Sequence, residues 1–130
     1  MTEAGRRDDR VDGTHRFPAW VYRDGAEPDP RFSLANERTF LAWVRTALAL
    51  LAGGVGLEAL KIPSLDGPRL AASAALLVLG LLAVVQGWIG WARTERSLRL
   101  ARAIPGPTLG VVIAVGVLVA AGLVVIGSLL

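Results

Sequence analysis

The 130-residue sequence contains no cysteine and a single histidine, and charged residues make up only 19% of it. Without cysteine the chain has no disulfide framework and no thiol nucleophile, and His15 alone cannot form a Cys/His cluster for zinc, haem or an iron–sulfur centre. The sequence also has no paired carboxylates at catalytic spacing, no nucleophile with a histidine partner and no glycine-rich phosphate loop. We therefore expect no metal site, no cofactor and no enzymatic activity.

Charge is absent from two long segments of the chain. Residues 70–92 form a run of 23 uncharged residues and residues 103–130 a run of 28, whereas about 20 apolar residues suffice to cross a bilayer as a helix. Residues 40–60 are equally apolar apart from Arg45 and Glu58. We therefore predict an all-α integral membrane protein with three transmembrane helices, at about residues 34–60, 69–99 and 107–130.

A water-soluble helical bundle is the alternative to this architecture. It would need a polar stripe on each helix, and residues 70–92 offer only Ser73 and Gln86 for that purpose. Small residues four positions apart would instead allow helices to approach each other closely in lipid. Such pairs are Ala49 with Gly53, Ala83 with Gly87, and Gly116 with Ala120.

Basic residues are unevenly distributed along the chain. Residues 1–39 contain seven arginines, whereas the first connection between spans contains only Lys61 and Arg69. The second connection contains Arg93, Arg96, Arg99 and Arg102. Because short segments rich in arginine and lysine stay in the cytosol, we predict a cytosolic N-terminus and second connection, with the C-terminus outside. Since residues 1–39 contain no apolar h-region, the first span is expected to be the insertion signal of a multi-pass protein of the inner or plasma membrane.

Residues 1–30 are polar and are predicted to form a mobile cytosolic tail, with residues 31–130 as the membrane domain. One apolar cluster interrupts the tail, consisting of Phe17, Trp20, Val21 and Tyr22. This cluster suits the headgroup interface, a groove on the cytosolic side of the protein, or a loosely solvated tail. Because Pro28 and Pro30 disfavour helix before them, Ser33 or Asn36 is expected to cap the first helix.

The entry to the first span, residues 31–46, carries a row of arginines. Arg38 and Arg45 are two helical turns apart and so share one face. Arg45 lies about 7 Å inside Phe40 along the helix axis. An arginine at the bilayer centre costs about 2.5–3.5 kcal/mol on insertion scales, which a polar partner would offset; alternatively, Arg45 only reaches back to lipid headgroups. The candidate partners are Asn36, Glu37 and Gln86.

A second group of arginines follows the second span. Arg93, Arg96 and Arg99 spiral around the helix end, where Glu95 can pair with Arg99 at i,i+4. Seven arginines at this side of the membrane face two acids, Glu37 and Glu95, which leaves five positive charges uncompensated. Guanidinium groups match phosphate oxygens, so we expect a phosphate-bearing anion such as an anionic lipid, a nucleotide or polyphosphate, and no nucleic acid. The candidate ligand-binding residues are Arg31, Asn36, Glu37, Arg38, Arg45, Arg93 and Arg96.

Residues 31–46 read RFSLANERTFLAWVRT, a string that resembles the YidH-like family, also called domain of unknown function 202. The resemblance covers roughly residues 17–130 and implies a small three-helix membrane protein without an established activity. The string is also similar to the first-helix entry of the membrane domain of the eukaryotic vacuolar transporter chaperone complex, which implies assembly around a polyphosphate-conducting pore. The chain departs from that complex because it lacks the polyphosphate-synthesising and phosphate-sensing domains. The matching positions are Asn36, Glu37, Arg38 and, more loosely, Arg45.

These features favour a small homo-oligomeric membrane protein whose first helices meet around an axis. Arg38 and Arg45 would then face inward and bind, or conduct, phosphate-bearing anions from the cytosol. The alternative is a non-catalytic accessory or assembly subunit whose cytosolic arginines and Trp20 dock a partner protein. A third hypothesis is a structural protein whose arginines only pack at the lipid interface.

Overall fold

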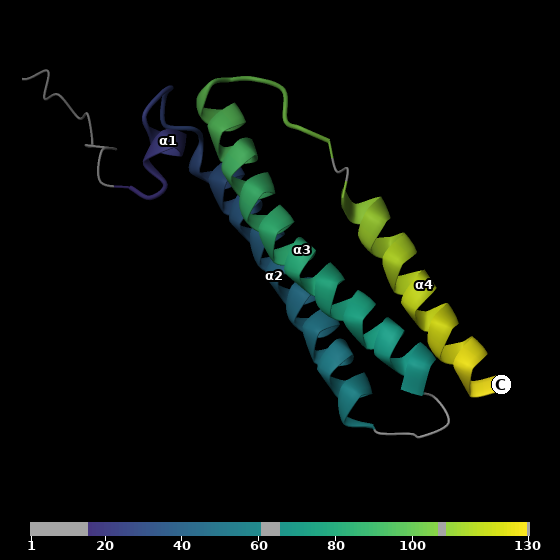
Figure 1. Ribbon diagram of the computed structural model, residues 1–130. Helices are drawn as coiled ribbons and strands as arrows, with labels where there is room; N and C mark the ends of the chain where they lie inside the picture. The colour runs from purple at the N-terminus through teal and green to yellow at the C-terminus, as the bar shows by residue number, and fades with distance from the viewer. Residues whose placement is uncertain (1–15, 61–65, 107–108, 130) are drawn as a thin grey trace, which may run out of the picture.

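The computed structural model describes residues 16–60, 66–106 and 109–129, and all regular elements in this part of the chain are helices (Figure 1). A short helix, α1 (Ala19–Tyr22), precedes three long ones, α2 (Pro30–Ala59), α3 (Asp66–Arg99) and α4 (Leu109–Leu129). Each long helix contains a segment long and apolar enough to cross a membrane. The prediction of an all-α membrane protein with three spans is confirmed.

Helix α2 begins at Pro30, before the predicted start near residue 34. Proline suits the first helical position because its ring fixes φ and its missing N–H would have no helical partner there. The side chain of Asp29 accepts a hydrogen bond from the backbone N–H of Arg31 at 2.9 Å and so caps the helix. The prediction that Ser33 or Asn36 caps it is wrong, since both residues lie inside the helix.

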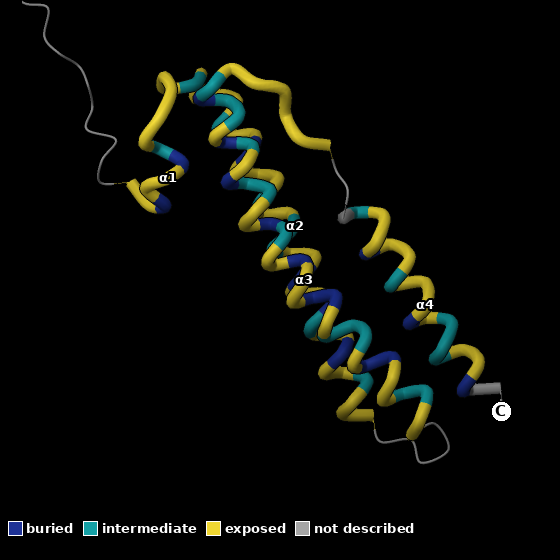
Figure 2. The backbone as a smooth tube through the Cα atoms, turned by 45° about the horizontal axis from the view of Figure 1, so that its top comes forward, coloured by how far each residue is buried: buried dark blue, intermediate teal, exposed yellow. Residues whose placement is uncertain are grey.

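Helices α2 and α3 form a closely packed antiparallel pair (Figures 1 and 2). A β-carbon on Gly54 would lie 2.8 Å from Leu77, and one on Gly80 would lie 2.7 Å from Leu51. The Ser73 hydroxyl donates a hydrogen bond to the Gly54 carbonyl at 2.8 Å. In lipid, helices associate through such close packing and interhelical hydrogen bonds. This pair is therefore the frame that positions the rest of the molecule.

Of the small-residue pairs predicted on these two helices, only the pair on α3 lies at the contact between them. Ala83 and Gly87 are buried in α3, where Gly87 faces α2. In contrast, Ala49 and Gly53 are exposed on α2. The inward face of α2 instead includes Gly54, so the expected α2 pair is one position out of register with the contact.

Helix α4 packs chiefly against α3, and its Ile113 joins the buried apolar cluster to which Ala47 and Leu50 of α2 belong. Ile113 and Ala120 are its most deeply buried apolar side chains. At Gly116, the side chain of Leu79 approaches to 2.7 Å from the place a β-carbon would occupy. Because α4 lies on the α3 side of the pair, the face of α2 opposite α3 stays exposed (Figures 1 and 2).

The end of α3 is closed by a left-handed residue, Ala101, with φ of 50°. The N–H of Arg102 donates to the Ser97 carbonyl at 2.9 Å, and the N–H of Ala101 donates to the Leu98 carbonyl at 3.3 Å. This is the Schellman pattern, which satisfies carbonyls that the helix end leaves free. Residues 102–106 then lead away from α3 towards α4 (Figure 1).

Candidate functional site

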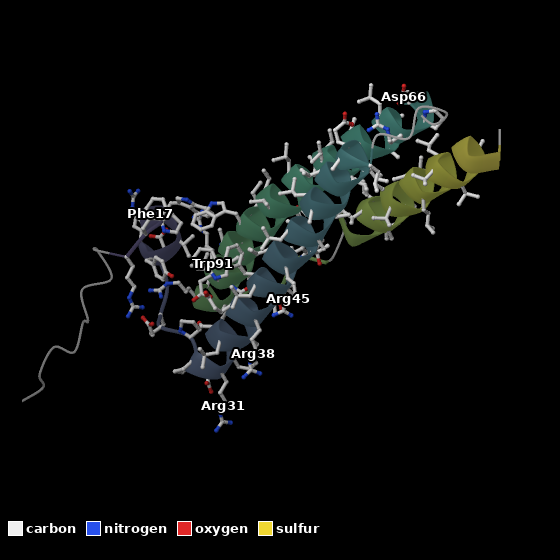
Figure 3. All side chains as sticks on the ribbon, turned by 90° about the horizontal axis from the view of Figure 1, so that it is seen from below. Phe17, Arg31, Arg38, Arg45, Asp66 and Trp91 are labelled. Carbon is white, nitrogen blue, oxygen red and sulfur yellow. The ribbon has the colours of Figure 1, made fainter. Side chains whose placement is uncertain are left out.

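Arg31, Arg38 and Arg45 project from the same side of α2 (Figure 3). Their seven-residue spacing places them there because seven residues make almost two complete turns. All three side chains are exposed, and none pairs with a carboxylate in the part of the chain that the structure describes. These three residues, called the α2 arginine stripe below, are therefore a row of uncompensated positive charges.

The partners expected for Arg45 do not contact it. Asn36 is buried at the contact with α3, where its amide donates to the Trp91 carbonyl at 3.1 Å and to the Glu95 carboxylate at 3.2 Å. Glu37 is exposed on α2 and Gln86 is half-buried on α3. Across the described ranges, no hydrogen bond or ion pair joins any of these three to Arg45. The three candidate partners therefore do not bind Arg45 in the described part of the chain.

Glu95 is the polar centre of the α2–α3 contact at this end of the pair. It is 5% exposed, and its two carboxylate oxygens accept hydrogen bonds from the Ser33 hydroxyl at 2.9 Å and the Asn36 amide at 3.2 Å. Because Ser33 and Asn36 are three residues apart, they reach Glu95 from one face of α2. Sequence reasoning missed this role, although Glu95 is the only acidic residue after residue 66. The predicted pair of Glu95 with Arg99 is wrong, since Glu95 turns towards α2.

Arg99 instead binds the N-terminal segment, residues 16–29. Its guanidinium lies 3.4 Å from the Glu27 carboxylate and donates to the backbone carbonyls of Asp24 at 3.4 Å and Tyr22 at 3.5 Å. Only 7% of the Arg99 side chain is exposed. Arg96 lies 3.8 Å from the Asp24 carboxylate. These two arginines therefore position the N-terminal segment.

Apolar contacts also hold the N-terminal segment against the end of α3 (Figure 1). Val21 is fully buried, and the Phe17 ring stacks on Trp88 with ring centroids 6.0 Å apart. The Arg96 guanidinium lies 5.9 Å from the centre of the Trp20 ring. Of the three interpretations of the aromatic cluster, a site on the protein itself is the one that these contacts support. The predicted tail thus includes a packed part, while its residues 1–15 lie outside the described residues.

The backbone of the N-terminal segment completes the hydrogen bonding of α3. Gly25 adopts a left-handed φ of 89°, and a β-carbon at this position would overlap the carbonyl of Arg99. Glycine lets the chain pass close enough for the Ala26 N–H to donate to that carbonyl at 3.1 Å. Carbonyls in the last turn of a helix have no intrahelical partner, so the segment caps α3.

Glu27 joins two arginines from different parts of the chain. Its carboxylate lies 2.8 Å from Arg16 in addition to its contact with Arg99. The hydrogen bond from Arg16 lowers the pKa of Glu27 below its ordinary value and raises the pKa of Arg16. Burial raises the pKa of the Tyr22 hydroxyl. The sequence-based count of five uncompensated charges left out this segment, whose Asp24 and Glu27 pair with two of the counted arginines, Arg96 and Arg99.

The structure divides the predicted ligand-binding residues into three groups. The group exposed on α2 consists of Arg31, Glu37, Arg38 and Arg45. The group engaged in contacts within the protein consists of Asn36 and Arg96. Arg93 stands alone, exposed on α3 and without a carboxylate partner among the described residues. Among those same residues, no group of three His, Cys, Asp or Glu side chains is suited to hold a metal ion.

Comparison with known proteins places these features in a family. The family described as "Domain of unknown function (DUF202)" matches residues 31–97, which include the α2 arginine stripe and Glu95. "Inner membrane protein YidH" of Escherichia coli K12 is 49% identical over 88 residues, which are 65% of this chain and 75% of that protein. "Uncharacterized protein Rv2272" of Mycobacterium tuberculosis H37Rv is 47% identical over 83 residues, 62% of this chain and 66% of that protein. No solved structure matches the chain.

Proposed function

The chain belongs to the DUF202 family, and on that premise we propose that it is a homo-oligomer that binds phosphate-bearing anions through the α2 arginine stripe. Its three spans and its inner-membrane relative make it a multi-pass protein of the cell membrane. Because neither family nor relatives carry an assigned activity, the proposal is supported by the geometry of α2. Catalysis is no part of it.

The observation that supports the proposal is a regular row of exposed leucines and arginines on α2. Leu34, Leu41 and Leu48 are 61%, 50% and 61% exposed, and Arg38 and Arg45 fall between them at alternating spacings of four and three residues. That heptad spacing is the one by which parallel helices pack in left-handed coiled coils. The opposite face of α2 is already occupied by α3. The exposed face is therefore suited to pack against α2 of a second copy.

Symmetry then explains how the arginines would act. In a closed ring of identical subunits with parallel α2 helices, every Arg38 lies at one depth and every Arg45 at another. Such rings of like charge inside a membrane are costly unless an anion neutralises them. Phosphate is the fitting anion because guanidinium forks pair with two of its oxygens at once.

The orientation belongs to the same proposal. The arginine-rich ends of α2 and α3 would face the cytosol, with the C-terminus outside, so that anions reach the stripe from inside the cell. Since the chain contains no cysteine, single cysteines introduced at exposed Ala103 and Leu60 report the orientation. In intact cells, a membrane-impermeant thiol reagent should label position 60 and not position 103.

Binding of polyphosphate by purified protein in neutral-lipid nanodiscs tests the proposal. Arg38→Gln and Arg45→Gln should each lower the affinity roughly tenfold, the loss of about 1.4 kcal/mol expected for one charge-assisted contact. Arg23→Gln is the matched control, because Arg23 is an exposed arginine outside the stripe. Equal affinities in all four proteins would refute the assigned role. Conduction is tested separately by polyphosphate flux into liposomes, which Arg45→Gln should reduce.

A second candidate function, docking of a partner protein, is favoured by one observation. The packed N-terminal segment displays two large apolar side chains, Phe17 at 80% and Trp20 at 46% exposure, which a mobile tail would not hold in place. Crosslinking in membranes separates the two proposals. A ladder of copies of this chain alone supports the homo-oligomer, whereas a stoichiometric foreign protein that is lost in Trp20→Ala supports an accessory or assembly subunit.

A further inference from the structure

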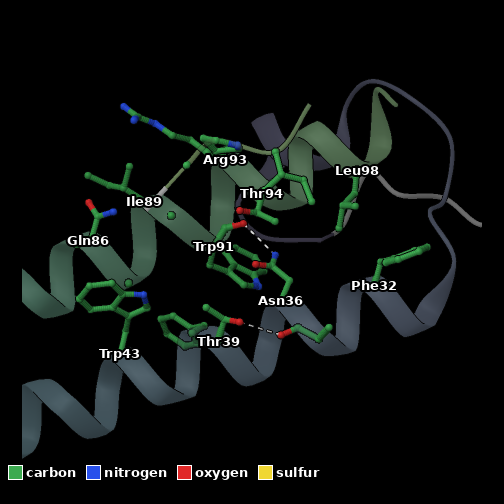
Figure 4. Close-up of a pocket in the computed structure, with 17 residues that line it drawn as sticks. Phe32, Asn36, Thr39, Trp43, Gln86, Ile89, Trp91, Arg93, Thr94 and Leu98 are labelled. Carbon is green, nitrogen blue, oxygen red and sulfur yellow. Dashed lines mark hydrogen bonds between the residues drawn. The ribbon is translucent and has the colours of Figure 1, made fainter. Parts of the chain in front are cut away.

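A groove of about 520 Å³ lies between α2, α3 and the start of the connection to α4 (Figure 4). Its size is in the range of roughly 300–1,000 Å³ that is usual for ligand sites. Helix α2 contributes aromatic side chains to its wall, and the connection contributes Ile104 and Pro105. Its polar lining includes Thr39, Gln86 and Arg93. The groove, called the α2–α3 groove below, is thus apolar with a few polar groups.

The groove crosses the level at which the hydrocarbon of a bilayer meets the headgroups. On α3 its lining runs from Gln86, inside the uncharged run of residues 70–92, past Arg93, the first charge after that run, to Leu98. Trp43 and Trp91 also line it, and tryptophan is enriched at membrane interfaces. We therefore expect the groove to face lipid at the depth of phosphate and ester groups.

Arg93 is the uncompensated charge of this groove. Its neighbours Arg96 and Arg99 pair with Asp24 and Glu27, whereas no described carboxylate lies within ion-pair distance of exposed Arg93. Gln86 lies seven residues earlier on the same helix, about 10 Å deeper along the axis. Its half-buried amide makes no hydrogen bond with the described residues. A fitting ligand thus has an anionic end, a hydrogen-bond acceptor below it and an apolar tail.

We propose that the α2–α3 groove binds one anionic phospholipid, with its phosphate on Arg93, an ester carbonyl near the Gln86 amide and an acyl chain along the aromatic wall. Charge complementarity selects this ligand, because the guanidinium at the groove rim requires an anion. The groove is distinct from the α2 arginine stripe. The lipid site therefore goes beyond the proposed function, and either can fail without the other.

Gly90 provides a way to close the groove. A β-carbon at this position would meet only the Gln86 amide nitrogen, at 3.8 Å, so that a larger side chain has free space in front of it. At Gly87, one turn earlier, a β-carbon would lie 2.9 Å from the Trp43 side chain. Gly90→Leu should therefore fill the groove without separating α2 from α3.

Native mass spectrometry of the full chain in detergent tests the site, with phosphatidylglycerol and phosphatidylcholine of identical acyl chains as probes. The native protein should retain one phosphatidylglycerol per chain and prefer it roughly tenfold, as one charge-assisted contact would give. Arg93→Gln should abolish the preference, and Gly90→Leu should weaken retention of both lipids. Arg102→Gln is the control, because it removes an equal charge outside both the groove and the stripe and should change nothing. Arg45→Gln tests whether the lipid binds at the stripe instead.

Several outcomes would overturn the lipid site. The first is that the native protein shows no preference for phosphatidylglycerol. The second is that Arg102→Gln loses the preference as fully as Arg93→Gln, which would show diffuse electrostatic attraction. The third is that only Arg45→Gln loses the preference, which would assign the lipid to the stripe. Displacement by soluble glycerol phosphate would show a site for free phosphate, because a bound lipid also holds by its acyl chain. Since Arg93 is exposed, its substitution should leave folding intact, and Arg93→Gln remains decisive even where Gly90→Leu does not fold.

Discussion

The arginines at the end of α3 and those on α2 carry the same charge in different surroundings. Arg96 and Arg99 lie beside Asp24 and Glu27 of the N-terminal segment. The α2 arginine stripe has no carboxylate partner in any of the described ranges and is exposed along its length (Figure 3). The first set therefore holds the protein together, and the second is free to meet something outside the chain.

This difference shows that the role of an arginine at a membrane entry depends on acids far away in the sequence. Glu27 and Arg99 are separated by 72 residues. A local count of charges assigns both sets to one anion site, whereas in the folded chain the first set is paired with carboxylates and the second has no such partner among the described residues. Each substitution below tests whether the two sets really differ, beginning with the largest expected effect.

Gly25→Val should release the N-terminal segment from α3. Its β-carbon would overlap the Arg99 carbonyl, and the left-handed φ adds about 1–2 kcal/mol of strain for a residue other than glycine. With roughly another 1–3 kcal/mol from overpacking, trypsin should cleave after Arg16 and Arg23 about a hundredfold faster. Gly67→Val is the control, because a β-carbon at Gly67 meets nothing. An unchanged cleavage rate would show that the segment is not anchored there.

Arg99→Gln should accelerate the same cleavage roughly tenfold, since it removes charge-assisted hydrogen bonds worth about 1.5 kcal/mol at their lower range. Arg38→Gln removes an equal charge from the exposed stripe and should leave the rate unchanged. If both variants were cleaved at the same rate, the distinction between the two sets would be lost.

Glu95→Ala should loosen the α2–α3 pair while leaving the N-terminal segment in place. The change removes the acceptor of Ser33 and Asn36, and hydrogen bonds between membrane helices are worth about 0.6–1.7 kcal/mol. The change in the free energy of unfolding is measured by adding SDS to the protein in detergent and monitoring the loss of the helix signal. Faster trypsin cleavage after Arg23 in this variant would show that Glu95 also helps to hold the N-terminal segment, and would support the predicted pair of Glu95 with Arg99 instead.

Lowering the pH should also release the N-terminal segment from α3, with a smaller effect than the substitutions above. The pKa of Glu27 is lowered in the folded chain, chiefly by the hydrogen bond from Arg16. The contribution of Glu27 to holding the segment is therefore complete above the ordinary glutamate pKa of about 4.3. It is lost as the pH falls through the lower pKa of Glu27 in the folded chain. Spin labels on cysteines introduced at Ala19 and Ala103 report the distance between the N-terminal segment and the connection that follows α3. The same acid-induced separation in Glu27→Gln would exclude Glu27 as its cause.

Local patterns predict much of this architecture. The uncharged runs place three spans because a bilayer accepts only helices with few charges, and the seven-residue spacing places the stripe on one face of α2. The start of α2 was misplaced because Asp29 and Pro30 already form a complete cap and first turn. The hydrogen bond of Asn36 with Glu95 joins residues 59 apart, a separation at which helical periodicity carries no information.

The sequence by itself determined that this is a three-span membrane protein with an arginine row at one end, because hydropathy and helical period act over short stretches of chain. Only the tertiary structure decided which polar groups neutralise one another. It turned Glu95 towards Ser33 and Asn36, brought Glu27 to Arg99, and left the α2 arginine stripe and Arg93 without a described carboxylate partner. Electrostatic pairing depends on distance in space, and that distance is set by how the helices pack.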